Sequence, residues 1–284
     1  MKGLCLAGGG IKAAAHIGAL KAFEEENIKF DSVSGASSGS IIATMYALGY
    51  NSDEMWKMFQ KYVKKIKYVE WKNIIEMVVG LLFTGKIIIN GLNSGKVIEK
   101  IIKEICNEKD IQNINEIEMP LLITMVGLQV GTLYVATSKN MRYSYSDKIK
   151  YITDMPIGKA VRASCSFPFV IEPCTYNDIE MIDGGIRENL PWKELKDIGT
   201  DEVYGIEFQT ILDEKDCCIN MIDVATRSVN LLCHELSIYE KNGIDKLITI
   251  PLKKVALLDN SKIFELYDIG YKETKRQLTL QKSL

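Results

Sequence analysis

The segment GLCLAGGGIKAAAHIGAL, Gly3–Leu20, decides the fold at the start of the chain. A short apolar run leads into three consecutive glycines, Gly8, Gly9 and Gly10, and small residues with helical spacing follow. This order predicts a β-strand over residues 2–7, a tight loop, and a helix over about 11–26. A glycine loop at the start of a helix can bind negative charge with its backbone N–H groups. The segment therefore raises the question of which anion the loop holds.

Strand and helix patterns alternate along the rest of the chain. We expect further strands over residues 30–34, 120–128, 131–138, 180–183, 202–208 and 246–252, and helices over 38–48, 52–68, 95–107 and 221–239. The second and third of these strands are predicted to form a hairpin. The alternation predicts an α/β fold with a largely parallel sheet, and without a repeat or linker residues 1–284 are expected to form a single domain.

Composition excludes several classes of function. The 284 residues include 35 basic and 37 acidic side chains, and a net charge of −2 gives no reason to expect a nucleic-acid partner. The seven cysteines form no CxxC pair, and with two histidines no zinc site of familiar spacing can be built, so no metal or other cofactor is expected. We expect reduced thiols and a cytoplasmic protein, since the first apolar stretch is too short for a signal peptide. The richness in Lys, Ile and Asn is typical of an AT-rich, bacterial genome.

Residues 74–89, IIEMVVGLLFTGKIII, form the longest apolar stretch, interrupted by Glu76 and Lys86. It is too short and too charged to span a membrane. A buried helix followed by a strand or loop is one interpretation, and a surface that touches lipid is the other. The basic segment KYVKKIKY, residues 61–68, precedes it and has two interpretations of its own, a solvated helix face or a contact with lipid.

The segment SGASSGS contains the pattern G-x-S-x-G as Gly35, Ser37 and Gly39, between an expected strand and an expected helix. In that context the serine lies on a tight turn at the carboxyl end of a strand, where small neighbours let strand and helix approach. The alternative is a helix cap without chemistry, because serine is also a preferred capping residue. If Ser37 is a nucleophile, a base must accept its proton.

Asp183 ends an apolar strand in MIDGGIRENLP and is followed by Gly184 and Gly185. The paired glycines permit unusual backbone angles that position the carboxylate, and burial would raise its pKa toward that of a general base. An Asp-Gly turn without chemistry is the alternative. A triad of Ser37, Asp183 and His234 is also formally available, although His234 falls inside a helical pattern and His16 is expected to be a packing residue.

The glycine loop has two interpretations. Gly8, Gly10 and Ala13 satisfy the pattern of a dinucleotide-binding loop, but the second strand ends in the serine turn instead of the acidic residue that binds ribose, and Lys12 follows the glycines too closely for a P-loop. The other is an oxyanion hole, in which the N–H groups of Gly9 and Gly10 face a carbonyl oxygen that gains charge during the reaction. Only this interpretation gives the loop and Ser37 a shared purpose.

The motifs GGGIKAAAHIGAL, GASSGS, RASCSFPFV and DGGIRENLP together, in this order, resemble patatin-like phospholipases and acyl hydrolases. The segment GLNSG before a helix and the C-terminal SKIFELYDIGYKETKRQL are also similar, so the resemblance covers nearly the whole chain. It implies a three-layer α/β/α sandwich. The chain departs from the family pattern with Lys12 where arginine is common and Ala13 where glycine is common, which leaves the backbone donors in place.

The resemblance further implies a dyad without histidine, with Ser37 as nucleophile and Asp183 as base. Gly8, Gly9, Gly10 and Lys12 would form the oxyanion site, while Arg162, Pro168, Asn189 and Pro191 match the structural positions around the aspartate motif. We therefore expect a serine acyl hydrolase that cleaves phospholipids or related acyl lipids through an acyl-enzyme and touches a membrane surface transiently. A histidine-dependent esterase and a non-catalytic nucleotide-binding protein remain the alternatives.

Overall fold

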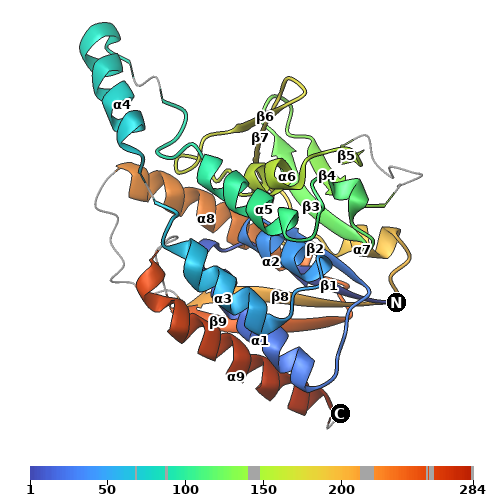
Figure 1. The fold of residues 1–284 in the computed structure, drawn as a ribbon. Coiled ribbons are helices and arrows are strands. Elements are labelled where there is room, and N and C mark those ends of the chain that lie inside the picture. The colour runs from blue at the N-terminus through green and yellow to red at the C-terminus, as the bar shows by residue number, and fades with distance from the viewer. Residues whose placement is uncertain are drawn as a thin grey trace.

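A mostly parallel β-sheet covered by helices on both faces forms the body of the protein (Figure 1). This computed structural model describes residues 1–67, 69–86, 89–139, 148–211, 221–253, 255 and 259–282. The predicted α/β fold, a three-layer α/β/α sandwich, is confirmed.

The described strands follow one another in space in the order β5-β4-β3-β2-β1-β8-β9, with β7 pairing to β3 and β6 to β7. Their bounds are β1 (Lys2–Leu6), β2 (Ser32–Ala36), β3 (Leu121–Gly127), β4 (Leu133–Thr137), β5 (Ile149–Ile152), β6 (Cys174–Tyr176), β7 (Ile179–Asp183), β8 (Glu202–Ile211) and β9 (Lys246–Lys253). The pairs β1–β2, β2–β3, β1–β8, β8–β9 and β4–β5 are parallel, and β3 is antiparallel to both β4 and β7. The carboxyl ends of the parallel core strands β3, β2, β1, β8 and β9 therefore meet at one edge.

The helices are α1 (Ala13–Glu25), α2 (Ser38–Ala47), α3 (Ser52–Val63), α4 (Trp71–Thr84), α5 (Lys96–Asn107), α6 (Ile157–Ser164), α7 (Lys193–Asp197), α8 (Met221–Glu240) and α9 (Ile263–Lys282). Single 3₁₀ turns are η1 (Gly10–Lys12), η2 (Ile114–Glu116), η3 (Gly184–Ile186) and η4 (Asn260–Lys262). Alternate residues of β1 show that both sheet faces are covered. Leu4 and Leu6 belong to the larger core, with α1, α2, α5 and α9, while Cys5 belongs to a second core that includes Trp192 and Leu195.

Most expected elements occur, and their limits differ for local reasons. The hairpin of β3 and β4 is confirmed, as are the strands β8 and β9 with α8 between them. The second strand begins at Ser32 and not at residue 30, and the helix expected over 52–68 ends at Val63. The short elements β5, β6 and α7 were not expected, because three to five residues carry too little periodicity to stand out.

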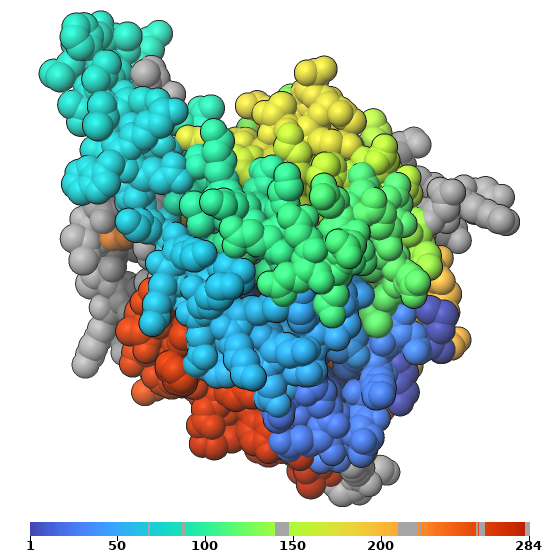
Figure 2. Space-filling view, viewed as in Figure 1, coloured from blue at the N-terminus to red at the C-terminus, as the bar shows by residue number. Residues whose placement is uncertain are grey.

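The interpretation of residues 74–89 as a buried helix is wrong for the part that the structure describes. Helix α4 buries only Asn73 and Gly80, and it stands away from the body of the protein (Figures 1 and 2). Across the described ranges, no helix combines the length and apolar character needed to cross a membrane. Residues 87 and 88 of this stretch lie outside the described residues.

Candidate active site

Ser37 lies on a strained turn between β2 and α2. Its backbone has φ +49° and ψ −129°, a conformation that residues with a Cβ seldom adopt and that is found mostly at functional sites. Close approach of strand and helix enforces the turn, because a Cβ on Gly39 would lie 2.3 Å from the carbonyl oxygen of Leu6 and one on Gly35 would lie 2.6 Å from the Gly39 backbone. The turn is anchored by the Ser37 N–H, which donates to Ser164 Oγ at 2.8 Å. It has the geometry of a nucleophile elbow.

The sheet brings Asp183 to this serine through the register of β3. Ala36, the last residue of β2, pairs with Thr124 of β3, and Asp183, the last residue of β7, pairs with the next residue, Met125. Strand β7 thus takes the place beside β3 at the point where β2 ends. Residues that are 146 positions apart in the chain become neighbours in space.

Ser37 Oγ donates a hydrogen bond to Asp183 Oδ2 at 2.5 Å. The other carboxylate oxygen, Oδ1, accepts the N–H of Gly185 at 2.8 Å, and the Asp183 N–H donates to the carbonyl oxygen of Ser166. The Asp183 side chain is buried, and burial raises its pKa from 3.8 to about 7 despite the opposing effect of the two hydrogen bonds. A carboxyl group with that pKa can gain and lose a proton near neutral pH.

The glycine loop lies directly against the serine. A Cβ on Gly8 would come within 2.7 Å of the Ser37 Cβ. The Gly8 N–H donates to Asn189 Oδ1 at 2.9 Å and the Gly9 N–H to Ser38 Oγ at 3.1 Å. Among the described residues the N–H groups of Gly10 and Ser38 have no acceptor. The Gly9 N–H is therefore held by a hydroxyl, and the oxyanion role of Gly9 and Gly10 stays a prediction.

Lys12 follows the loop in η1, and its side chain passes close to Gly9. Burial lowers the pKa of the Lys12 ammonium from 10.5 to about 8. Its Nζ lies 6.0 Å from the centre of the Phe208 ring. The group is therefore charged at neutral pH and loses its charge in mildly alkaline solution.

The segment RASCSFPFV supports both members of the pair. Ser164 binds the Ser37 backbone and Ser166 binds that of Asp183, two roles that the sequence did not indicate. Arg162 is buried and donates from Nε and Nη2 to the carbonyl oxygen of Ser94, which ties this segment to the start of α5. The only signal for the two serines was their place inside a motif of the family resemblance.

Neither histidine takes part in the pair. His16 is buried, donates from Nε2 to the Ala7 carbonyl oxygen at 2.8 Å, and its pKa is lowered to about 4 by burial, so it is a neutral packing residue. His234 is exposed on α8 and makes no side-chain hydrogen bond to Ser37 or Asp183 within the part of the chain that the structure describes. The direct bond between Ser37 and Asp183 leaves no place for an imidazole between them.

Helix α8 lies close to Asp183, and its last turn binds the residues that follow the DGG motif. Glu240 accepts the N–H groups of Asn189 and Leu190, and its backbone carbonyl accepts Trp192 Nε1. Burial, and after it the charge of Asp183, raises the pKa of the Cys233 thiol to about 11. The last turn of α8 therefore fixes the tail of the DGG motif, and Pro191 within that tail accepts Ser34 Oγ.

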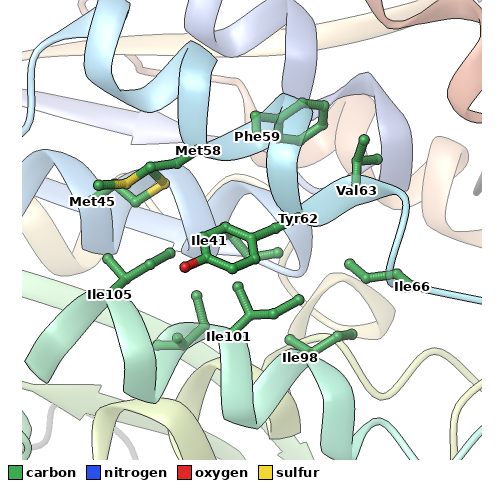
Figure 3. Close-up of a pocket in the computed structure, with 11 residues that line it drawn as sticks. Ile41, Met45, Met58, Phe59, Tyr62, Val63, Ile66, Ile98, Ile101 and Ile105 are labelled. Atoms are coloured by element: carbon green, nitrogen blue, oxygen red, sulfur yellow. The ribbon is translucent and has the colours of Figure 1, made fainter.

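An apolar hollow of about 440 Å³, its open mouth included, lies between α2, α3 and α5 (Figure 3). Helix α2 contributes Ile41 and Met45, one and two turns after Ser37, and α5 contributes a stripe of four isoleucines that includes Ile101. The residues that line the hollow are almost entirely apolar, and the hollow is open to solvent on one side. The same helix thus carries the serine at its start and one wall of the hollow along its side.

No group of three or more His, Cys, Asp or Glu side chains is arranged to hold a metal ion within the described residues. The five cysteines in those residues are free thiols, and Cys217 and Cys218 lie outside them.

Gly184, directly after Asp183, packs against the backbone of Thr124. A Cβ at this position would lie 2.3 Å from the Thr124 carbonyl oxygen, so the close approach requires glycine.

A sequence model of the family described as patatin-like phospholipase matches residues 4–196, which include the elbow, the glycine loop and the DGG motif. The chain belongs to the patatin-like phospholipase family. The predicted resemblance is therefore confirmed.

Similar sequences place this patatin-like chain among relatives of very different size. It is 29% identical over 200 residues to protein YqhO of Bacillus subtilis (strain 168), covering 65% of the chain and 63% of YqhO. It is 24% identical over 312 aligned positions to the lysophospholipase NTE1 of Meyerozyma guilliermondii, covering 99% of the chain but 19% of NTE1. The chain therefore spans less than two thirds of the length of either relative.

Solved structures share the fold of this patatin-like chain. The crystal structure of VipD from Legionella pneumophila superposes with a TM-score of 0.53 at 15% identity, covering 98% of this chain and 66% of VipD. The ExoU chain of the SpcU–ExoU complex from Pseudomonas aeruginosa gives 0.50 at 16% identity, covering 98% and 52%. At such identities the likeness concerns the fold alone.

Proposed function

We propose that this chain is a serine lipid acyl hydrolase that cleaves fatty-acyl esters of phospholipids or related lipids. The observation that carries the proposal is the 2.5 Å hydrogen bond from Ser37 Oγ to a buried Asp183 whose pKa is near neutral. A strained serine beside a base is the arrangement that nucleophilic catalysis requires. Membership of the patatin-like phospholipase family supports lipid esters as the substrate class.

In the first half of the reaction the Asp183 carboxylate accepts the proton of the Ser37 hydroxyl while Oγ attacks the ester carbonyl carbon. The carbonyl π electrons move to oxygen and form a tetrahedral oxyanion. The bond from carbon to the alcohol oxygen then breaks, Asp183 returns its proton to the departing alkoxide, and the acyl group remains on Ser37.

In the second half Asp183 accepts a proton from water, and the resulting hydroxide attacks the acyl carbon. The bond to Ser37 Oγ breaks, Oγ recovers the proton from Asp183, and the fatty acid leaves. One aspartate serves both halves because its raised pKa lets it take up and release a proton near pH 7. No cofactor takes part in this sequence.

The oxyanion would be stabilised by the N–H groups of Gly10 and Ser38, which lack acceptors among the described residues. Both belong to helix beginnings, where the helix dipole favours negative charge. Rotation of the Ser38 hydroxyl would release the Gly9 N–H as a third donor. Lys12 adds positive charge next to the loop, at a pH below its pKa of about 8.

The acyl chain of the substrate would lie in the hollow of Figure 3. Ile41 follows Ser37 by four residues on α2, so the hollow begins about 6 Å along the helix from the serine. Apolar walls favour an apolar ligand, because the ligand loses contact with water and gains dispersion contacts with the walls.

We further propose that the enzyme makes a transient contact with a lipid surface and that it acts in the cytoplasm.

Hydrolysis of a short-chain nitrophenyl ester by four proteins tests this function. Ser37→Ala and Asp183→Asn are expected to lose activity, while His234→Ala keeps that of the wild type. A fall in His234→Ala as large as in Ser37→Ala would favour the histidine-dependent esterase. If the wild type shows no hydrolysis of short esters or mixed lipids, and a nucleotide raises its melting temperature, the chain is a nucleotide-binding protein that retains the fold.

A further inference from the structure

Large exposed apolar side chains are concentrated on two helices. Of the twenty that the described residues expose, fourteen lie on α4 and α8. The seven on α4 are Trp71, Ile75, Val78, Val79, Leu81, Leu82 and Phe83, and the seven on α8 are Met221, Val224, Leu231, Leu232, Leu236, Ile238 and Tyr239. Single exposed apolar residues are scattered over most protein surfaces and need no explanation. A concentration of them on two helices, in contrast, is typical of an interaction site. We call these fourteen side chains the apolar rim.

Helix α4 is held at its base and is mostly exposed beyond it. Asn73 Nδ2 donates to the Gly91 carbonyl oxygen at 2.9 Å and to Glu172 Oε1 at 2.8 Å, and these contacts fix the first turn. At the far end Leu82 is 76% exposed and Phe83 82%. Figure 2 shows the segment standing clear of the molecule. Its 14 residues extend about 21 Å, which is too short to span a bilayer but long enough to enter its surface.

The base of α4 is joined to the segment that holds the candidate active site. The N–H groups of Leu92 and Asn93 donate to the Val170 carbonyl oxygen. The N–H of Glu70, just before α4, donates to the carbonyl oxygen of Leu92. Val170 follows Ser164 and Ser166, which bind the backbones of Ser37 and Asp183. Phe169, which directly precedes Val170, is also exposed. Helix α8, the other part of the rim, passes close to Asp183 and holds the tail of its motif. The base of α4 and the last turn of α8 are therefore both bonded to segments that hold the catalytic pair.

Positive charge lies along the segment before α4 and directly after its tip. Residues 61–86 contain six lysines and two glutamates, in a chain whose net charge is −2. Lys64, Lys67 and Lys86 are exposed. Apolar side chains beside exposed lysines match the two layers of a lipid leaflet, acyl chains and anionic headgroups. A second protein would also bury apolar surface, but it would not require this local excess of lysine.

We infer that the apolar rim docks this protein on a bilayer that contains anionic phospholipid, with the tip of α4 inserted and the catalytic pair facing the lipid. This inference rests on the proposed function, because the bilayer is the source of the substrate. Trp71 is 78% exposed, while Trp56 and Trp192 are packed against other side chains, so tryptophan emission reports on the rim.

Vesicles of phosphatidylcholine mixed equally with phosphatidylglycerol provide the test. Co-sedimentation and a blue shift of tryptophan emission are expected for the wild type and equally for Ser37→Ala. The double variant Leu82→Ser/Phe83→Ser should bind vesicles at least about tenfold more weakly, since it removes two apolar side chains from the inserted tip. Leu280→Ser, an exposed leucine near the C-terminal end of α9, is the matched control and should bind as the wild type does.

Charge is tested in the same way. Lys64→Glu/Lys67→Glu should weaken binding to the anionic vesicles, more so at low ionic strength, while Lys103→Glu on α5 should not. Hydrolysis of a soluble short-chain ester should stay at the wild-type rate in the Leu82→Ser/Phe83→Ser, Leu280→Ser, Lys64→Glu/Lys67→Glu and Lys103→Glu variants, whereas Ser37→Ala is inactive by design. Absence of vesicle binding by the wild type would overturn the inference, and so would dimers that Leu82→Ser/Phe83→Ser dissociates, because a second copy would then cover α4. Vesicle binding without any ester hydrolysis would overturn the proposed function and leave the docking surface standing.

Discussion

Asn189 Oδ1 accepts the Gly8 N–H at 2.9 Å, and this bond joins the glycine loop to the tail of the DGG motif. The Asn189 N–H in turn donates to Glu240 at the end of α8. One side chain therefore sets the distance between the loop that faces Ser37 and the strand that carries Asp183. Asn189 is a positioning residue in this account, since it does not touch the reacting atoms.

Asn189→Ala is expected to lower kcat about 10- to 100-fold, because the loop loses the acceptor that holds it against the serine. KM for a short-chain ester should change little. Asn189→Asp keeps an oxygen acceptor and should recover part of the loss. Asn115→Ala is the control, because Asn115 is exposed and makes no hydrogen bond to the glycine loop or the DGG motif among the described residues. Equal losses in Asn189→Ala and Asn189→Asp would remove the positioning role.

The pH dependence of kcat/KM should be bell-shaped. Asp183 must be ionised to accept a proton, so activity rises with pH through its pKa of about 7. Lys12 must be protonated to supply charge to the oxyanion loop, so activity falls as pH rises through its pKa of about 8. Lys12→Met should lower the maximum of kcat/KM and abolish its fall on the alkaline side. Stopped assays from pH 5 to 10 on the wild type and Lys12→Met measure both effects. A rising limb that stays unchanged in Asp183→Asn would exclude Asp183 as its origin.

Asp183 should cost stability where it is ionised. Its pKa of about 7 in the folded protein exceeds the ordinary value of 3.8, so the folded state binds the proton more tightly than the unfolded state does. The stability it contributes is complete below pH 3.8 and is lost as pH rises through 7. Asp183→Asn should therefore melt a few degrees above the wild type at pH 8 and close to it at pH 4. Asp178→Asn, an exposed turn residue, should show no such dependence on pH.

Local sequence was sufficient to predict the parts of the site that depend on neighbours in the chain. The apolar run before Gly8 and the small residues after it predict strand, loop and helix, and Gly35 and Gly39 predict the close crossing at Ser37. These features depend on steric requirements of a few adjacent residues. The fold class followed from the alternation of such units.

The partners of these groups could not be predicted, because they depend on register and packing across long separations. Nothing near Thr124 and Met125 in sequence indicates that β2 and β7 share the same side of β3. The acceptor role of Ser164 and the hydroxyl that holds the Gly9 N–H arise in the same way. Helix α4 shows the converse, since its apolar composition suggests burial but Asn73 and Gly80 are its only buried residues.

Filling the hollow should change chain-length preference without changing the chemistry. Ile101→Trp is expected to lower kcat/KM for a palmitoyl ester at least about tenfold while an acetyl ester is hydrolysed as before, because the added ring occupies the space proposed for the acyl chain. Ile41→Ala widens the same space and should favour longer or branched chains. Lys100→Trp places the same ring on the exposed side of α5 and is the control. Parallel changes for both esters would show that the hollow is not the acyl site.

The identity of the nucleophile is measured most directly by mass spectrometry after treatment of the folded protein with an alkyl fluorophosphonate. Ser37 Oγ should displace fluoride from phosphorus, so that the peptide containing Ser37 gains the mass of the phosphonyl group. The adduct should be absent in Ser37→Ala and should form much more slowly in Asp183→Asn, whose amide cannot accept the proton. A folded wild type that remains unmodified at Ser37, or is modified at the same rate without Asp183, would contradict the account.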